Sequence, residues 1–124
     1  MIKSKQNIIL MKAHNHCKSS VKRFGGKPKD YLSIHRWFDE SKAHYADIRH
    51  RALRHHTQGV ELCEQMFGVT IINSDNKEII VKSIAEQHII EDIGFIPSLQ
   101  DWFKEMRPRQ WMSSTKKVTK MNLS

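Results

Sequence analysis

The sequence of 124 residues has few of the features that would assign it to a class at once. Its two cysteines, Cys17 and Cys63, cannot form a disulfide framework and fit a reducing compartment. No apolar run approaches the roughly 18 residues of a membrane span, and the apolar cluster at 8–11 is shorter than the roughly 7–15 residues of a signal-peptide core. We therefore expect a soluble, cytoplasmic protein without a membrane partner.

Acidic residues are missing from both ends of the chain. Residues 1–29 carry eight Lys or Arg and residues 107–124 carry five, so all 13 acids lie in 30–106. Basic ends are typical of arms that hold phosphate groups, and equally of solubilising tails. We expect a flexible basic N-terminus at 1–6, a single His-rich helical domain at 7–112 and a disordered basic tail at 113–124.

Prolines and glycines are also few, at three and five, which permits long helices. Apolar periodicity and capping residues predict helices over 7–24, 31–38, 47–67, 84–93 and 99–106. Two β-branched runs flank the polar residues 73–77 and predict a β-hairpin near 69–82. The predicted fold class is mainly α (α+β), a compact helical domain of about five helices with one hairpin.

The helix expected over 47–67 is the most informative segment. Asp47 can cap its start and Gly68 can end it. One face of this helix collects His55, Gly59 and Cys63, with His56 at the edge. An interior glycine costs about 1 kcal/mol relative to alanine, so we expect close approach of a second helix or a bound ligand beside Gly59.

His88 and Asp92 lie one turn apart on the apolar face of the helix expected at 84–93. Burying both without partners would cost several kcal/mol, so they must pair with each other, with His55 or His56, or with a metal. Imidazole with carboxylate suits a divalent metal, with zinc as the first candidate. Our hypothesis is a metal site of His55, His56, His88 and Asp92 between the long helix and the 84–93 helix. Further candidate ligands are His16, His35, Asp39, His50 and Glu86.

Three classes of function remain open at this point. A metal with an open coordination position would permit metal-dependent hydrolysis of a phosphate ester held by Arg49, Arg51 and Arg54, although we favour binding over catalysis. The second class is an accessory protein that binds nucleic acid or a nucleotide. The third is a structural or assembly protein with a buried histidine network, for which a homo-oligomer is the candidate state. No complete signature of a metal site, a phosphate loop or a helix-turn-helix selects among them.

Six segments in a fixed order support a resemblance: HCKSSVKRFGG, DYLSIHRWFDESKAH, DIRHRALRHHTQG, INSDNKE, EQHIIEDIG and IPSLQDW. Over residues 16–112 they resemble an uncharacterised small-domain family of bacteria and phages, which carries only a domain-of-unknown-function label. The resemblance adds a phage-encoded accessory protein to the expectations, and it implies no activity. Its pattern marks His16, His35, Trp37, Asp39, His44, Arg49, His50, Arg51, His55, His56, Glu86, His88 and Asp92.

Overall fold

A computed structural model describes residues 5–113, with side chains from residue 12 onward, and confirms the mainly helical class with one hairpin. The longer elements are α1 (Lys5–Phe24), α2 (Leu32–Asp39), α3 (Thr57–Phe67), the hairpin of β1 (Thr70–Ile72) and β2 (Glu78–Ile80), α4 (Val81–Ile93) and α5 (Leu99–Phe103). Short 3₁₀ helices connect them: η1 (Pro28–Asp30), η2 (Glu40–Ala43), η3 (Ile48–Leu53) and η4 (Gln110–Met112).

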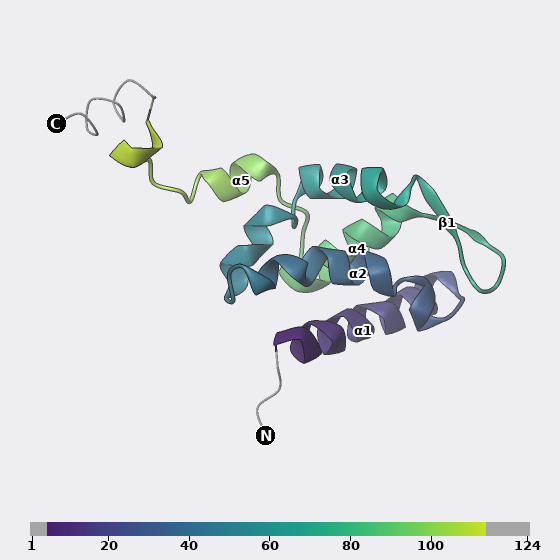
Figure 1. Cartoon of the computed structure of the whole chain (residues 1–124). Helices are drawn as coiled ribbons and strands as arrows, with labels where there is room; N and C mark the ends of the chain where they lie inside the picture. The colour runs from purple at the N-terminus through teal and green to yellow at the C-terminus, as the bar shows by residue number, and fades with distance from the viewer. Residues whose placement is uncertain (1–4, 114–124) are drawn as a thin grey trace.

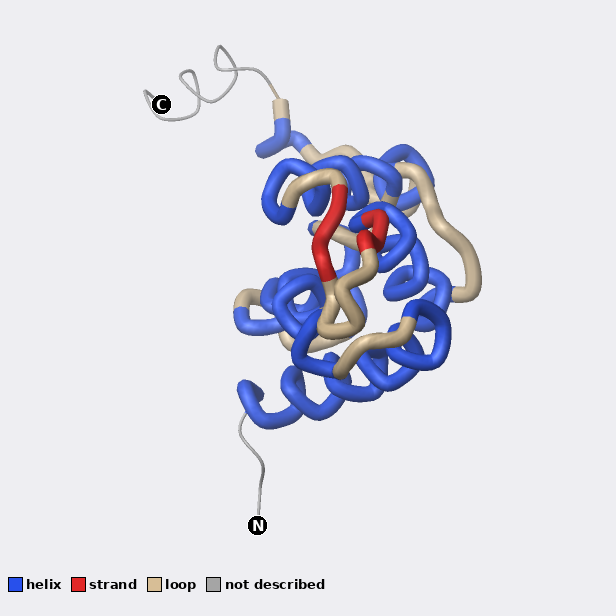
Figure 2. The backbone as a smooth tube through the Cα atoms, turned by 90° about the vertical axis from the view of Figure 1, so that its right-hand side faces the viewer, coloured by secondary structure: helices blue, strands red, loops and turns tan. Residues whose placement is uncertain are grey.

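Helix α4 is the element on which the domain is assembled. It contacts α1, α2 and α3, while α1 also packs along α2 (Figure 1). The apolar side chains of Phe38, Val60, Ile84 and Ile89 are buried where these helices meet. The two strands lie together at one side of this helical assembly (Figure 2).

The hairpin is antiparallel, with Thr70 opposite Ile80 and Ile71 opposite Ile79, inside the expected range of 69–82. Its loop is tied to the connection between α1 and α2. The Asp30 carboxylate accepts hydrogen bonds from both the backbone and the hydroxyl of Ser74, at 2.8 and 2.7 Å. Because a lone hairpin is marginally stable, these contacts explain how two three-residue strands persist here.

The single helix expected over 47–67 is wrong. Asp47 caps η3 instead of a long α-helix, and α3 begins only at Thr57, with the His56 ring as its N-terminal cap. A Cβ at position 59 would lie 1.6 Å from the backbone oxygen of Arg54. Glycine is therefore required by the chain's own turn, and not by a second helix or a ligand.

Other element ends differ by smaller amounts. Helix α1 includes Lys5 and Gln6 of the N-terminus expected to be flexible, α4 begins before its expected start, and α5 ends at Phe103. Residues 1–4, and the expected tail apart from Ser113, lie outside the described residues. Within residues 5–113, no helix has both the length and the apolar character required to cross a bilayer.

Candidate metal centre

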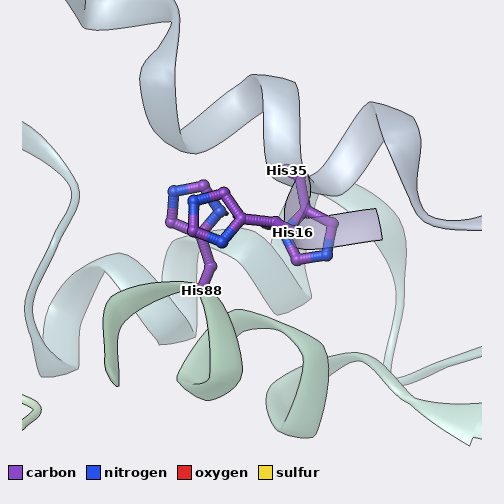
Figure 3. Close-up of side chains that lie close together, drawn as sticks. All are labelled: His16, His35 and His88. Atoms are coloured by element: carbon purple, nitrogen blue, oxygen red, sulfur yellow. Dashed lines mark hydrogen bonds between the residues drawn. The ribbon is translucent and has the colours of Figure 1, made fainter. Parts of the chain in front are cut away.

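A buried group of histidines and aspartates lies where the N-terminal helices meet α4. Figure 3 shows the rings of His16, His35 and His88 gathered there. All three rings are buried, and each offers a nitrogen within 4.8 Å of the others. A second set of ligand atoms also lies within 4.8 Å, one from each residue of His16, Asp39, His88 and Asp92.

The two carboxylates converge on the ring of His88. Its Nε2 lies 3.4 Å from Oδ1 of Asp39 and 3.2 Å from Oδ2 of Asp92. Nε2 of His55 contacts the same oxygen of Asp92 at 2.9 Å. These separations are close to the edge of a tetrahedron of ligands around zinc, which is about 3.3 Å when metal–ligand bonds are near 2.0 Å.

His16 is held in the orientation typical of a metal-binding histidine. Its Nδ1 lies 2.7 Å from Oε1 of Glu91, while its Nε2 faces Oδ1 of Asp92 at 3.1 Å. In metalloproteins, a carboxylate that accepts the second ring N–H fixes the tautomer of a ligating imidazole and increases its basicity. Glu91 therefore fixes the ring with Nε2 directed into the cluster. Burial would lower the pKa of His16, but the hydrogen bonds with Asp92 and Glu91 outweigh it and raise that pKa, so a metal ion would have to replace the proton on Nε2.

A chain of hydrogen bonds behind His88 begins at Gln87. The amide nitrogen of Gln87 donates to the backbone oxygen of His16 at 3.0 Å and to Glu91 at 3.2 Å, which fixes the amide orientation. The amide oxygen then faces the Ser20 hydroxyl at 2.8 Å. The hydroxyl also lies 3.1 Å from the backbone oxygen of His16. Both of these oxygens can only accept, so Ser20 gives its single proton to one of them. The His35 Nε2, 2.8 Å away, must then donate to Ser20.

The same chain determines the tautomer of His88. Burial, with smaller effects of His88 and His16, lowers the pKa of His35 to about 2, so this ring is neutral. With a proton on Nε2, neutral His35 can only accept at Nδ1, which lies 3.0 Å from Nδ1 of His88. His88 therefore donates from Nδ1. Its Nε2, between two carboxylates, requires a positive partner, either a second proton or a metal ion.

Both aspartates are ionised. Burial would raise the pKa of Asp92, but hydrogen bonds with His16, His55 and His88 outweigh it and hold that pKa far below its usual range. Burial would also raise the pKa of Asp39, but the hydrogen bond with His88 outweighs it, and that pKa is lowered too. Metal binding needs deprotonated carboxylates, and this pair supplies them.

Two buried polar atoms of the cluster's own histidines and aspartates find no hydrogen-bond partner among the described residues. One is Oδ2 of Asp39 and the other is Nδ1 of His55. A buried carboxylate oxygen without a partner loses its hydration and gains nothing in return. The donor set is two imidazoles and two carboxylates, and Oδ2 of Asp39 lacks a partner among the described residues. This set therefore fits a divalent transition metal.

Three candidate residues lie elsewhere. His56 caps α3 through Nδ1, and its Nε2 lies 3.2 Å from the backbone oxygen of Leu53, so both ring nitrogens are engaged outside the cluster. His50 is buried beside His55, but its Nδ1 pairs with the Ser41 hydroxyl. Glu86 lines a separate pocket between α3 and α4. The sequence pattern placed His56 at the edge of a helix face, but the chain breaks before α3 and His56 caps that helix instead.

The three arginines expected to hold a phosphate are not gathered at one place. Exposed Arg49 pairs with Asp47 at 2.7 Å, and Arg54 stacks over the Trp37 ring and donates to the Trp37 backbone oxygen. Only Arg51 reaches the cluster, where its guanidinium lies 4.0 Å from Oδ1 of Asp92.

Sequence reasoning did not identify three contributing residues. They are Glu91, which supports His16, and the buried pair Ser20 and Gln87, neither of which carried a signal of its own. Gln87 and Glu91 are four residues apart on α4 and contact each other. His88 and Asp92 have the same spacing, so the sequence could have indicated a second pair of polar residues beside them on α4.

Comparisons with known proteins identify one protein family. The model of a family described as "Domain of unknown function (DUF6915)" matches residues 11–112. Neither the curated proteins nor the solved structures contain a significant match to the chain. The function must therefore be argued from the geometry of the cluster.

Proposed function

The chain belongs to the family of the domain of unknown function DUF6915, and from its cluster we propose that it binds one divalent transition metal ion. The proposed ligands are His16 and His88 through Nε2, with Asp39 and Asp92 through carboxylate oxygens. Zinc is the first candidate, and manganese and iron suit the same donors. His55 donates to Asp92 and orients it. His56, Glu86 and His50 have no role as ligands in this proposal.

The observation that carries the proposal is the environment of Nε2 of His88. Two ionised carboxylates lie within 3.4 Å of it, and the ring's proton is committed to His35. A neutral His88 would then present a lone pair to two negative charges, which is repulsive. A metal ion at this point would be held by all three groups and would remove the repulsion.

A second function rests on the same observation. If His88 carries two protons, the imidazolium neutralises part of the buried charge and the cluster is a structural network that specifies the packing of α1, α2 and α4. A fully satisfied network can do so, but Asp39 Oδ2 has no partner among residues 12–113, whose side chains are described, and this favours the metal. Nucleic-acid binding and hydrolysis of a phosphate ester remain hypotheses without a comparable observation.

The test is the metal content of untagged protein, together with a matched pair of variants on α1. His16 lies in the cluster and His14, two residues earlier, is exposed. We expect about one metal ion per chain in the wild type and in His14→Ala, and at least a tenfold weaker affinity in His16→Ala. Elemental analysis and titration against a chromophoric chelator measure both quantities.

Folding must be separated from ligand loss in these variants. His88→Gln keeps a polar side chain at the buried position, and its circular dichroism reports whether the helices are retained. Thermal unfolding with and without a chelator adds a measurement on the unaltered chain, because a ligand that binds only the folded state raises the melting temperature. Absence of bound metal after exposure to zinc, manganese and iron, with an unchanged melting temperature, would refute the proposal in favour of the network.

A further inference from the structure

Two adjoining cavities lie beside α2, outside the proposed metal centre. Their volumes are about 460 and about 410 Å³, within the range of roughly 300–1,000 Å³ that is typical of small-molecule sites. Both cavities are lined by Arg36, Glu40 and Arg54, so they form one continuous space, which we call the α2 groove. Apolar side chains also line its second cavity, namely Trp37, Met66 and Phe67. None of these residues is a proposed metal ligand.

The two arginines of the α2 groove are not matched by a carboxylate. All acids of the chain lie among the described side chains, and the arginines that form ion pairs with them there are Arg49 and Arg51. Glu40 follows Arg36 at the spacing of a helical ion pair, but it is not among these partners. Arg36 and Arg54 therefore leave the groove with more positive charge than Glu40 offsets.

Arg54 is held in place by the side chain and the backbone of Trp37. Its guanidinium lies over the Trp37 ring, 4.2 Å from the centroid, and donates to the Trp37 backbone oxygen. A guanidinium has more N–H donors than this single bond uses. Because the side chain is already half-buried and oriented, an anion that binds to it orders it little further, which keeps the entropic cost of binding low.

The second cavity also offers an apolar surface. Met66, at the end of α3, is 62% exposed, and Phe67 packs edge-on against the Trp37 ring with 6.5 Å between the centroids. Trp37 is itself buried, and its indole N–H has no acceptor among the described residues. A buried donor without a partner is uncommon in proteins. The α2 groove therefore joins cationic donors to an apolar wall, a combination that suits a small molecule with an anionic and an apolar part.

Charge and geometry favour a phosphate monoester over a carboxylate as the anionic part. A single guanidinium fork satisfies both oxygens of a carboxylate. A phosphate monoester has a third terminal oxygen and roughly two negative charges near neutral pH, so it can use both Arg36 and Arg54. Glu40 opposes the anion, but its side chain is exposed and its charge is screened by water and salt.

We propose that the α2 groove binds a small phosphate monoester that carries a flat aromatic group. The phosphate lies between Arg36 and Arg54, and the aromatic group packs against Met66 and Phe67, since a thioether and an aromatic ring both favour such a partner. A mononucleotide and free phosphotyrosine share this chemistry. Of the arginines expected from sequence to hold a phosphate, the proposal retains Arg54. It does not depend on the proposed metal ion, because the groove residues are not its ligands.

Calorimetric titration of the full chain tests this inference. The probes are phenyl phosphate, adenosine monophosphate, inorganic phosphate and benzoate, each titrated with and without a metal chelator. We expect a single site per chain for at least one of the two esters, with an affinity at least about tenfold above those of inorganic phosphate and benzoate. The chelator should leave this affinity unchanged. The ester that binds more tightly distinguishes a phenolic ligand from a nucleotide.

Matched variants locate the anion. Arg36→Gln removes an exposed guanidinium without opening the core, and it should weaken binding of the tighter ester at least about tenfold. Arg49→Gln is the control, since Arg49 is exposed and paired with Asp47, and it should bind as the wild type does. Met66→Ser should bring the affinity for the ester closer to that for inorganic phosphate, because it removes part of the apolar wall.

Several results would overturn the inference. They are equal ester affinity in wild type and Arg36→Gln, binding of benzoate as tight as that of either ester, and absence of binding by both esters. Loss of ester binding on chelation would place the phosphate at the metal centre and would overturn the α2 groove as its site. Metal content measured on the same samples reports the proposed metal site independently.

Discussion

Replacing Ser20 by alanine tests the hydrogen-bond chain that we infer behind His88. Ser20 is fully buried and touches no proposed ligand side chain. Its hydroxyl accepts from His35 and donates toward Gln87, and this obliges His35 to accept from His88. Without the hydroxyl, His35 is free to carry its proton on Nδ1 and donate to His88. His88 would then carry its proton on Nε2, where the metal is proposed to bind.

The expected magnitude follows from this change of tautomer. Loss of an outer-shell partner typically weakens metal affinity 10–100-fold, or roughly 1.4–2.7 kcal/mol. The metal-free protein should also lose roughly 1–3 kcal/mol of stability, because the Gln87 oxygen and the His35 nitrogen lose a buried partner. The two effects are separable, since the first appears only as weaker binding to protein that is folded.

Metal affinity is measured by competition with a chromophoric chelator, and stability by urea unfolding of metal-free protein. Nitrogen-15 NMR of the imidazoles adds a direct readout, because the ring nitrogen shifts distinguish the tautomers of His88. Ser33→Ala, at an exposed position on α2, is the matched control and should behave as the wild type. An affinity of Ser20→Ala within twofold of the wild type, with an unchanged His88 tautomer, would refute the reasoning.

Three further predictions concern the surroundings of the cluster. Burial lowers the pKa of His50 from 6.5 to about 4, so the stability that neutral His50 provides is complete above pH 6.5 and is lost as the pH falls toward 4. In urea unfolding, metal-free wild type should lose about 2 kcal/mol more stability than His50→Asn does between about pH 7.5 and about pH 5. Gly59→Ala should destabilise the fold by about 3 kcal/mol in the same assay, because its Cβ would collide with the Arg54 backbone; a loss below about 0.5 kcal/mol would contradict that packing. Burial raises the pKa of Cys17 to about 11, and burial together with Glu64 raises that of Cys63 to about 12. Iodoacetamide should therefore modify both thiols slowly in native protein and rapidly after denaturation, and mass spectrometry measures the two rates.

Local patterns in the sequence determined much of the fold. The period of the apolar residues placed the helices that became α1, α2 and α4, and the β-branched runs placed the hairpin, because these signals act over a few neighbouring residues. The same reasoning identified His88 and Asp92 as unusual. Both lie on one face of α4 whatever that helix packs against, and burial of such groups demands partners.

Only the tertiary structure decided which partners they have. His16 and Asp39 come from α1 and α2, far along the chain from α4, and they meet His88 because of how these helices pack. His56 shows the reverse case, since a break at residues 54–56 turned it into a helix cap. Helical periodicity assumes that the helix continues, and whether it does depends on long-range contacts. The sequence therefore determined that His88 and Asp92 on α4 need partners, and the packing of α1 and α2 against α4 determined which residues supply them.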